Sequence, residues 1–321
     1  MKKLLTFVFG LIACAVQAQV KNNTFHVVDK QTNKPVASAT IAILRASLSI
    51  TTEKDGIFSI PGDLSIMKDT VVISAQRYIA FKLPLANLGN LDTIKMQQQP
   101  IIIADASLTI STDTLLNNYN RFDVGNYVGL HMGKGEFNYL QIAQKFDAKR
   151  AGTLLKKIDI ERLAFHFDKF KPLPDKGTSI LNGQYEYTEL EHTKFRLRVY
   201  DVSPLTGGPG KDLCDKIIEV KSREDNLLSI NLKSYNIVIP NKTFFVAVEW
   251  MRDYMNMGYV HVGNNYGTKK AYPNYRPAVG LSPTKGAALN IWALNLNQQW
   301  SLYIYHSPDF TDLAMKATVG Y

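Results

Sequence analysis

Histidine and carboxylate residues are the side chains from which this sequence could build a catalytic or metal site. A zinc peptidase closes two imidazoles and a carboxylate on one ion, and its usual signature places a glutamate three residues after a histidine, with another histidine later. The six histidines are scattered and none has a glutamate at that spacing: His26, His131, His166, His192, His261 and His306. Nucleophile-elbow and phosphate-loop motifs are absent from the sequence as well. We therefore predict a protein that is not an enzyme and that has no metal site and no cofactor.

Pairs of acidic residues keep one catalytic alternative open. A glycoside hydrolase needs two carboxyl groups about 5 to 10 Å apart. Glu189 with Glu191, and Asp201 with Asp212, are the pairs that the sequence offers. Because carboxylates are also common on solvated strand faces, an unrecognised hydrolase remains an alternative to a non-catalytic function.

The most unusual stretch is rich in aromatic residues and runs from residue 250 to residue 275. It contains Trp250 and five tyrosines among Met, Asn and Gly: Tyr254, Tyr259, Tyr266, Tyr272 and Tyr275. Aromatic rings stack on sugar faces and anchor protein interfaces. On loops at one end of a β-sandwich, these tyrosines would form a binding platform. The alternative is that Trp250 and Tyr259 belong to the core and the other tyrosines cover the end of the sandwich.

The first 18 residues predict export. Lys2 and Lys3 precede an apolar run from Leu4 to Ala15, and Val16-Gln17-Ala18 is a small-residue cleavage site. The run is too short for a transmembrane span, which needs about 20 apolar residues. We expect residues 1–18 to be a signal peptide and the mature protein to be periplasmic, secreted or at the outer-membrane surface.

A second way of processing the same segment would attach the protein to a membrane. Leu11-Ile12-Ala13-Cys14 resembles a bacterial lipobox, in which Cys14 would carry a lipid anchor. Cleavage after Ala18 would instead remove Cys14 and leave Cys214 as the single cysteine, so that no intramolecular disulfide could form. We expect Cys214 to be a buried, unreactive side chain.

The charge of the chain does not indicate a nucleic-acid partner. The formal charge is +9, and loss of Lys2 and Lys3 would leave 9 − 2 = +7. The basic residues occur in short runs such as Lys156-Lys157 and Lys269-Lys270, which is typical of solvated strand faces.

Residues 19–98 have the pattern of a small all-β domain. Short alternating segments such as Ala39 to Leu44 are separated by turn residues, including Lys54-Asp55-Gly56, where glycine supplies a positive φ. About seven strands without a helical period predict an antiparallel β-sandwich.

Three segments of this domain resemble the carboxypeptidase regulatory-like family. They are Lys34-Pro-Val-Ala-Ser-Ala-Thr-Ile41, Thr51-Thr-Glu-Lys-Asp-Gly-Ile-Phe58 and Ser74-Ala-Gln-Arg-Tyr78, in the order and spacing of that family. The resemblance implies a transthyretin-like accessory sandwich without catalytic residues. Such domains occur beside zinc peptidases and at the start of many secreted and outer-membrane proteins of Bacteroidota. Arg77 stands where the family usually has a glycine.

Residues 99–136 are expected to form a linker, in which Ser111 to Tyr119 could begin a short helix. Residues 137–321 then predict ten strands and a jelly-roll-like sandwich. The expected strands are Phe137–Phe146, Leu154–Phe167, Lys194–Val202, Lys216–Val220, Leu227–Leu232, Thr243–Met251, Tyr259–Val262, Leu289–Leu294, Leu302–His306 and Ala314–Val319. Four segments in order, Lys194-Phe-Arg-Leu-Arg-Val-Tyr-Asp201, Pro209-Gly-Lys-Asp-Leu213, Ser229-Ile-Asn-Leu-Lys-Ser-Tyr-Asn-Ile-Val-Ile-Pro240 and Phe244-Phe-Val-Ala-Val-Glu-Trp250, resemble the C-terminal domain of the same Bacteroidota proteins. The pattern is also similar to carbohydrate-binding and adhesin-like jelly rolls.

Three Asp-Thr pairs followed by a hydrophobic residue resemble the sites at which Bacteroidota O-glycosylate secreted proteins. They would place glycans on Thr70, Thr93 and Thr114.

Together these patterns predict an all-β exported protein of two sandwiches. We expect a non-catalytic binding or adhesion module of the cell envelope, whose partner is an envelope protein or a glycan and not a nucleic acid. The alternatives are a carbohydrate-binding protein that uses the aromatic residues at 250–275, and a hydrolase.

Overall fold

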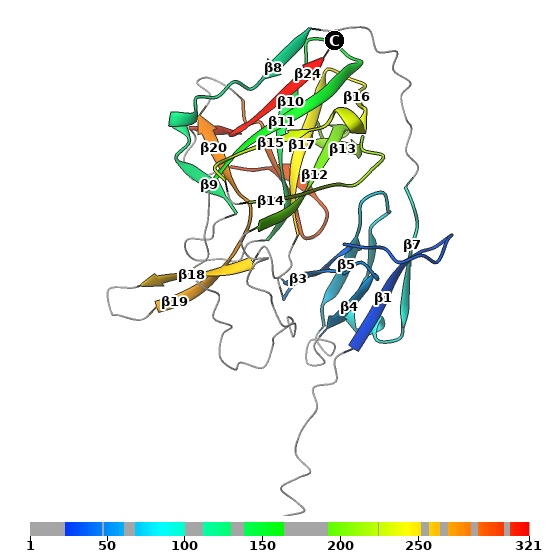
Figure 1. Ribbon diagram of the computed structural model, residues 1–321. Coiled ribbons are helices and arrows are strands. Elements are labelled where there is room, and N and C mark those ends of the chain that lie inside the picture. Colours follow the sequence, from blue (N-terminus) through cyan, green and yellow to red (C-terminus); the bar gives the residue numbers. More distant parts are fainter. Residues whose placement is uncertain are drawn as a thin grey trace, which may run out of the picture.

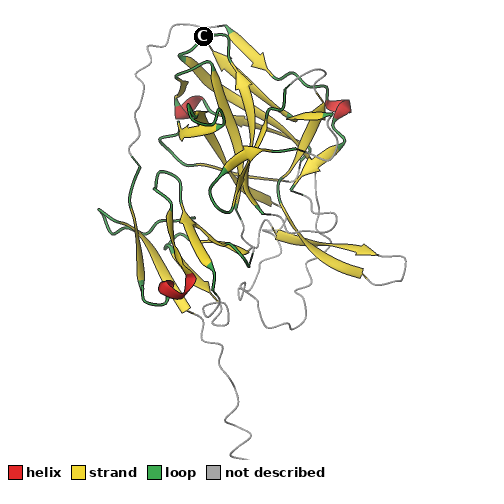
Figure 2. Ribbon diagram, turned by 180° about the vertical axis from the view of Figure 1, so that it is seen from behind, coloured by secondary structure: helices red, strands yellow, loops and turns green. Residues whose placement is uncertain are grey.

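The protein is built almost entirely of β-strands, as its sequence predicts. The computed structural model describes residues 23–46, 48–60, 68–99, 112–129, 138–163, 192–223, 225–251, 257–263, 269–283, 288–304 and 309–320. Within these ranges the single α-helix is α2, which spans only Leu85–Leu88. Figures 1 and 2 show an N-terminal sandwich and a larger second sandwich.

The described part of the N-terminal sandwich contains seven strands in two sheets. One sheet has the order β4-β1-β7 and the other the order β3-β2-β5-β6. The strands are β1 (Asn23–Asp29), β2 (Thr40–Ile43), β3 (Leu48–Thr51), β4 (Ile57–Ile60), β5 (Thr70–Ser74), β6 (Phe81–Pro84) and β7 (Thr93–Met96). All pairs are antiparallel except β1 with β7, which is parallel and which we did not expect.

Side-chain alternation explains how these strands form a core. Phe25 and Val27 of β1 and Ile41 and Ile43 of β2 are buried in one hydrophobic cluster. In each strand the two buried residues are separated by one residue. This spacing is the period of a strand that turns one face toward the core.

Gly56 and Arg77 occupy turn positions with the backbone conformation that glycine favours. Gly56 has φ +72°, and a Cβ there would lie 2.4 Å from the Val27 carbonyl oxygen, so only glycine fits. Arg77 has φ +70°. The chain therefore makes a left-handed turn before Tyr78 even though a non-glycine residue stands there.

The second sandwich has two larger sheets. One has the order β13-β12-β17-β10-β21-β22, with β14 also on β12; the other has the order β23-β20-β11-β24-β8, with β15 and β16 on β11 and β9 on β20. The strands of the first sheet are β10 (Tyr139–Asp147), β12 (His192–Val202), β13 (Pro209–Asp212), β14 (Ile218–Arg223), β17 (Thr243–Trp250), β21 (Ile291–Asn295) and β22 (Trp300–Leu302). Those of the second are β8 (Asp113–Leu116), β9 (Asn126–Val128), β11 (Thr153–Leu163), β15 (Leu227–Asn231), β16 (Ile237–Ile239), β20 (Ala278–Pro283), β23 (Phe310–Leu313) and β24 (Met315–Gly320).

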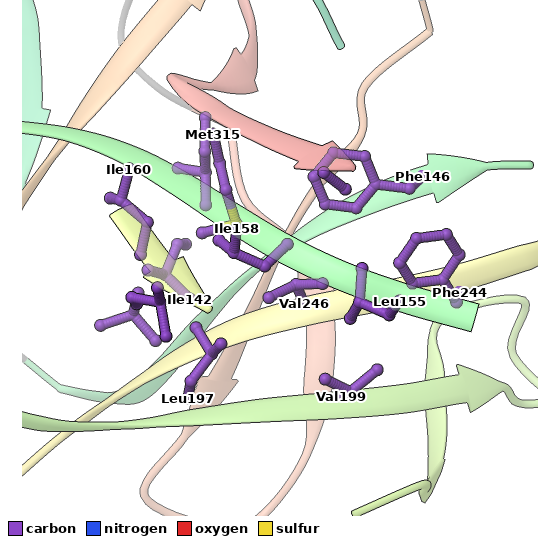
Figure 3. Close-up of a cluster of buried hydrophobic side chains, with 14 of the residues drawn as sticks. Ile142, Phe146, Leu155, Ile158, Ile160, Leu197, Val199, Phe244, Val246 and Met315 are labelled. Carbon is purple, nitrogen blue, oxygen red and sulfur yellow. The ribbon is translucent and has the colours of Figure 1, made fainter. Parts of the chain in front are cut away.

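A single large hydrophobic core lies between these two sheets. Leu197, Val199 and Val246 come from one sheet, and Ile158 and Met315 come from the other (Figure 3). All five side chains are fully buried.

The central strand β17 is covered on both faces, as its continuous apolar sequence predicts. It lies between β12 and β10, and its residues from Phe244 to Trp250 are all buried. The neighbouring strand β12 differs from what its sequence alone indicates, because apolar Phe195, Leu197 and Val199 alternate with polar residues as in a strand with one face in water. Arg196, Arg198 and Tyr200 alternate with the core residues, yet they are only 2%, 7% and 5% exposed. Carboxylate partners and aromatic neighbours cover this outer face, a non-local effect that periodicity cannot reveal.

The segment at 112–129 also differs from the expected linker with a short helix. Residues Asp113–Leu116 form β8, which pairs with β24, and Asn126–Val128 form β9, which pairs with β20. The one helical turn in this segment is the 3-10 helix η2 (Arg121–Asp123). A free edge of the second sandwich offers backbone partners to this stretch, and that pairing outweighs a weak local helix propensity.

The two sandwiches pack against each other through an apolar contact. Ala42 of β2 and Val72 of β5 lie in one buried cluster with Leu140, Leu294 and Leu296 of the second sandwich. Leu44 and Trp300 pack against the same cluster.

Two hydrogen bonds border this domain contact. The Gln298 Nε2 donates to the Ser74 Oγ over 3.1 Å, and the Gln76 Nε2 donates to the Lys216 carbonyl over 3.3 Å. The outer face of the β3-β2-β5-β6 sheet is therefore an interface.

Among the described residues, no helix has the length and apolar character needed to cross a bilayer.

Candidate functional site

A two-stranded ribbon carries the described part of the aromatic stretch. Strands β18 (Met257–Gly263) and β19 (Lys269–Tyr275) pair antiparallel, from Met257 with Tyr275 to Gly263 with Lys269. In the part of the chain that the structure describes, neither strand joins another sheet. Both views show the ribbon reaching away from the two sandwiches (Figures 1 and 2).

The base of the ribbon is fixed to the core of the second sandwich. Trp250 is buried at the end of β17, and its indole Nε1 donates to the Pro277 carbonyl oxygen over 3.0 Å. The Tyr275 backbone N–H donates to the Gly129 carbonyl over 3.2 Å, and its partly buried side chain packs on the core. The ribbon is therefore tied to the second sandwich at the end of β19.

The structure separates the predicted platform residues. Tyr259 and Tyr272 lie in β18 and β19, and Tyr275 lies at the base. Tyr254 and Tyr266 lie outside the described residues. Of the two residues that we considered as core, Trp250 is buried, whereas Tyr259 belongs to the ribbon.

The strand register assigns these tyrosines to two faces of the ribbon. Paired residues share a face, and faces alternate along a strand. Tyr259 pairs with Pro273 and is in phase with Tyr275, which pairs with Met257. Tyr272 pairs with Val260 and is in the opposite phase. Each face of the ribbon therefore holds at least one tyrosine position.

A buried charge network lies on the outer face of the neighbouring sheet. The Arg198 guanidinium contacts the Asp212 Oδ2 over 2.8 Å and the Glu249 Oε2 over 2.9 Å. Burial lowers the pKa of Arg198, but the surrounding negative charge, including Asp212 and Glu249, raises it above its ordinary value. The Tyr200 hydroxyl donates to the Gln141 Oε1 over 2.8 Å beside this network.

Asp201 and Asp212, one of the two carboxylate pairs considered for a hydrolase, make structural contacts. Asp212 binds Arg198 and also accepts from the Cys214 backbone N–H over 3.0 Å. Asp201 accepts from the Asn241 Nδ2 over 2.8 Å. Both carboxylates thus organise the fold locally. Glu189 and Glu191 lie outside the described residues.

The three histidines within the described ranges belong to three different elements. His26 is exposed on β1 of the N-terminal sandwich, while His192 and His261 belong to β12 and β18. His131, His166 and His306 lie outside the described residues. Across the described ranges, no three His, Cys, Asp or Glu side chains come close enough together to hold a metal ion.

Cys214 is buried in the large core, as predicted. Burial raises the pKa of its thiol, so the reactive thiolate is disfavoured at neutral pH.

The three threonines of the glycosylation-like pattern differ in exposure. Thr93 is exposed, and Thr70 and Thr114 are partly buried. In one of the three pairs the aspartate has a structural role, because the Asp69 carboxylate accepts from the backbone N–H groups of Arg45, Ala46 and Thr70. Glycosylation of Thr70, Thr93 and Thr114 stays a prediction, and mass spectrometry of the native protein tests it.

An aromatic cluster beside the domain contact was not anticipated from the sequence. Trp292 packs edge-on against Phe245, and Trp300 packs edge-on against Tyr200, with ring centroids 6.2 and 5.5 Å apart. Leu302, whose register partner is Trp292, is 45% exposed. The alternation of apolar residues from Trp300 to Leu302 is the sequence signal that could have indicated it.

The sequence matches no protein-family model, and no curated protein resembles it closely enough to count as a relative. Function is therefore argued from the geometry of this chain.

Proposed function

We propose that the protein is a non-catalytic binding module of the bacterial envelope and that it binds its partner through the β18–β19 ribbon. The observation that carries this proposal is the ribbon itself, a projecting element with tyrosine positions on both faces and a base tied to a rigid core. Binding residues commonly sit on such projections, because a packed scaffold positions them while they remain accessible. Tyrosine suits this role, since it offers a large contact area with little loss of conformational entropy.

The two packed sandwiches support the same proposal. The Ala42 and Val72 contact with the second sandwich joins both domains into a scaffold from which the ribbon extends. The resemblance of residues 19–98 to an accessory, carboxypeptidase regulatory-like domain agrees with a supporting role for the N-terminal sandwich.

The test is binding of the purified full-length mature protein to native envelope fractions. We expect the double variant Tyr259→Ser/Tyr272→Ser to bind at least about tenfold more weakly, because loss of an aromatic anchor commonly costs more than 1 kcal/mol. Phe122→Ser is the matched control, since Phe122 is 95% exposed on η2, which is not part of the ribbon, and its loss should leave binding unchanged. Equal binding by the double variant and the control would refute the proposed function.

Export forms the second part of the proposal, and the intact mass of the protein from its native envelope tests it. We expect a mature chain that begins at Gln19, because Val16-Gln17-Ala18 follows the apolar run at the usual distance. A chain that begins at lipidated Cys14 would instead make the protein a lipoprotein, with its partner at the membrane. Recovery of a chain that retains Met1 would show that it is not exported by this route.

A further inference from the structure

The ribbon lies in a long stretch of sequence that lacks acidic residues. Between Asp253 and Asp309 there is no Asp or Glu. At the average of the whole chain, 28 acidic residues in 321, a stretch of this length would hold about five. Four basic residues occur in it: Lys269, Lys270, Arg276 and Lys285. The projecting ribbon therefore lies in a stretch that combines positive charge with tyrosine.

The register places a basic residue and a tyrosine on each face of the ribbon. Lys270 and Tyr272 are two residues apart in β19 and share a face, about 7 Å apart along the strand. Lys269 occupies the other face, which also holds the positions of Tyr259 and Tyr275. The lysines occupy the end of β19 where Lys269 pairs with Gly263, and Tyr275 occupies the end at the base.

This placement fits a chain of sugars that carries negative charge. Tyrosine rings stack on sugar faces, and ammonium groups attract carboxylate or sulfate groups. We infer that the ribbon binds an acidic polysaccharide, an inference that rests on the proposed function and specifies the ligand class. A membrane surface fits less well, because an element that lies on a bilayer needs one apolar face and one polar face. Here Val260 and Val262 occupy one face, and Met257 and Tyr259 the other.

The experiment measures binding of the full-length mature protein to two acidic polysaccharides, one carboxylated (polygalacturonate) and one sulfated (dextran sulfate), with neutral dextran as the uncharged comparison. We expect binding to at least one acidic polymer and none to dextran. We also expect the affinity to fall about tenfold or more between low salt and 0.5 M salt, since salt screens exposed charges.

The decisive variant is Lys269→Glu/Lys270→Glu, which we expect to weaken acidic polysaccharide binding about tenfold or more. Its matched control is Lys30→Glu/Lys34→Glu, which makes the same change in net charge at two exposed positions of the N-terminal sandwich. That control should stay within about twofold of the unmodified protein, because its site is remote from the ribbon.

Three results would overturn the inference. They are equal binding by the two charge-reversal variants, equal binding to dextran, and tighter binding to anionic lipid vesicles or single-stranded DNA than to either polysaccharide. If Tyr259→Ser/Tyr272→Ser still weakens envelope binding about tenfold or more in these cases, the proposed function stands and only the ligand class is wrong. If that variant binds envelopes normally, the proposed function fails as well.

Discussion

Asp29, at the end of β1, connects the start of the N-terminal domain to residues near the end of its sequence. Its Oδ1 accepts from the Thr32 backbone N–H over 2.7 Å. Its Oδ2 accepts from the Tyr78 hydroxyl over 3.0 Å and from the Gln98 Nε2 over 2.7 Å. These donors stabilise the ionised carboxylate, the Thr32 N–H most strongly, and hold the pKa of Asp29 far below its ordinary value.

The low pKa of Asp29 predicts a pH dependence of stability. In the unfolded chain an aspartate has a pKa of about 3.9, so Asp29 stabilises the fold above about pH 4, and this contribution is lost as the pH falls toward the folded-state pKa. We expect Asp29→Asn to lower the free energy of unfolding at pH 7, and the deficit to shrink at pH 3. Urea unfolding at both pH values measures this.

The control for Asp29 is Asp92→Asn, which alters an exposed carboxylate of the same sandwich. We expect it to change stability little at either pH. A deficit for Asp29→Asn of the same size at pH 7 and pH 3 would contradict the assignment.

At the scale of single elements, strand β12 shows how a buried charge is accommodated in a sheet. Arg198 binds two carboxylates, Asp212 from β13 and Glu249 from β17, so three adjacent strands are joined on their outer face. Arg196, two residues earlier on the same face, is directly opposite Glu249 in the register, yet its Nε has no hydrogen-bond partner in the described structure. Burial accordingly lowers the pKa of Arg196.

This difference predicts unequal effects of two matched substitutions. We expect Arg198→Met to lower the free energy of unfolding by about 3 to 5 kcal/mol, because it leaves two buried carboxylates without their cation. Arg196→Met should cost much less, since methionine fills similar space and removes a poorly paired charge. Urea unfolding of both variants tests this, and equal losses would show that the network does not stabilise the sheet.

At the scale of the whole molecule, the contact between the sandwiches determines whether they unfold together. Val72 lies on the outer face of its sheet and is buried at the contact with the second sandwich. Burial of a valine contributes about 1.5 to 3 kcal/mol, and a charge at this position would oppose domain packing. We expect Val72→Asp to separate the single unfolding transition into two.

The positions of the tryptophans make this separation measurable. All three, Trp250, Trp292 and Trp300, belong to the second sandwich, so their fluorescence reports on that domain, whereas circular dichroism reports on both. In the unmodified protein the two signals should change together, and in Val72→Asp they should diverge. Lys82→Asp, which alters the exposed register partner of Val72, is the control and should keep them together. Coincident transitions in Val72→Asp would mean that the contact does not couple the domains.

The sequence by itself determined the all-β class and the strands whose side chains alternate or are uniformly apolar. Nine of the ten strands expected after residue 136 share three or more residues with strands of the structure, including β12 and β17, whereas the expected strand Leu302–His306 meets β22 at Leu302 alone. The turn at Gly56 and the burial of Cys214 were also predictable, because each follows from the local chemistry of one residue. Periodicity carries this information, since it depends on residues only a few positions apart.

Only the tertiary structure decided which strands meet and which faces are covered. The short strands β8 and β9 exist because distant strands offer them backbone partners, and their own sequence favoured a linker. Burial of Arg196 and Arg198 depends on carboxylates and packing from other strands. The placement of Tyr259 and Tyr272 on a projecting ribbon depends on two strands that pair with each other instead of joining a sandwich sheet. Each of these outcomes is a choice among non-local partners, which a local pattern does not encode.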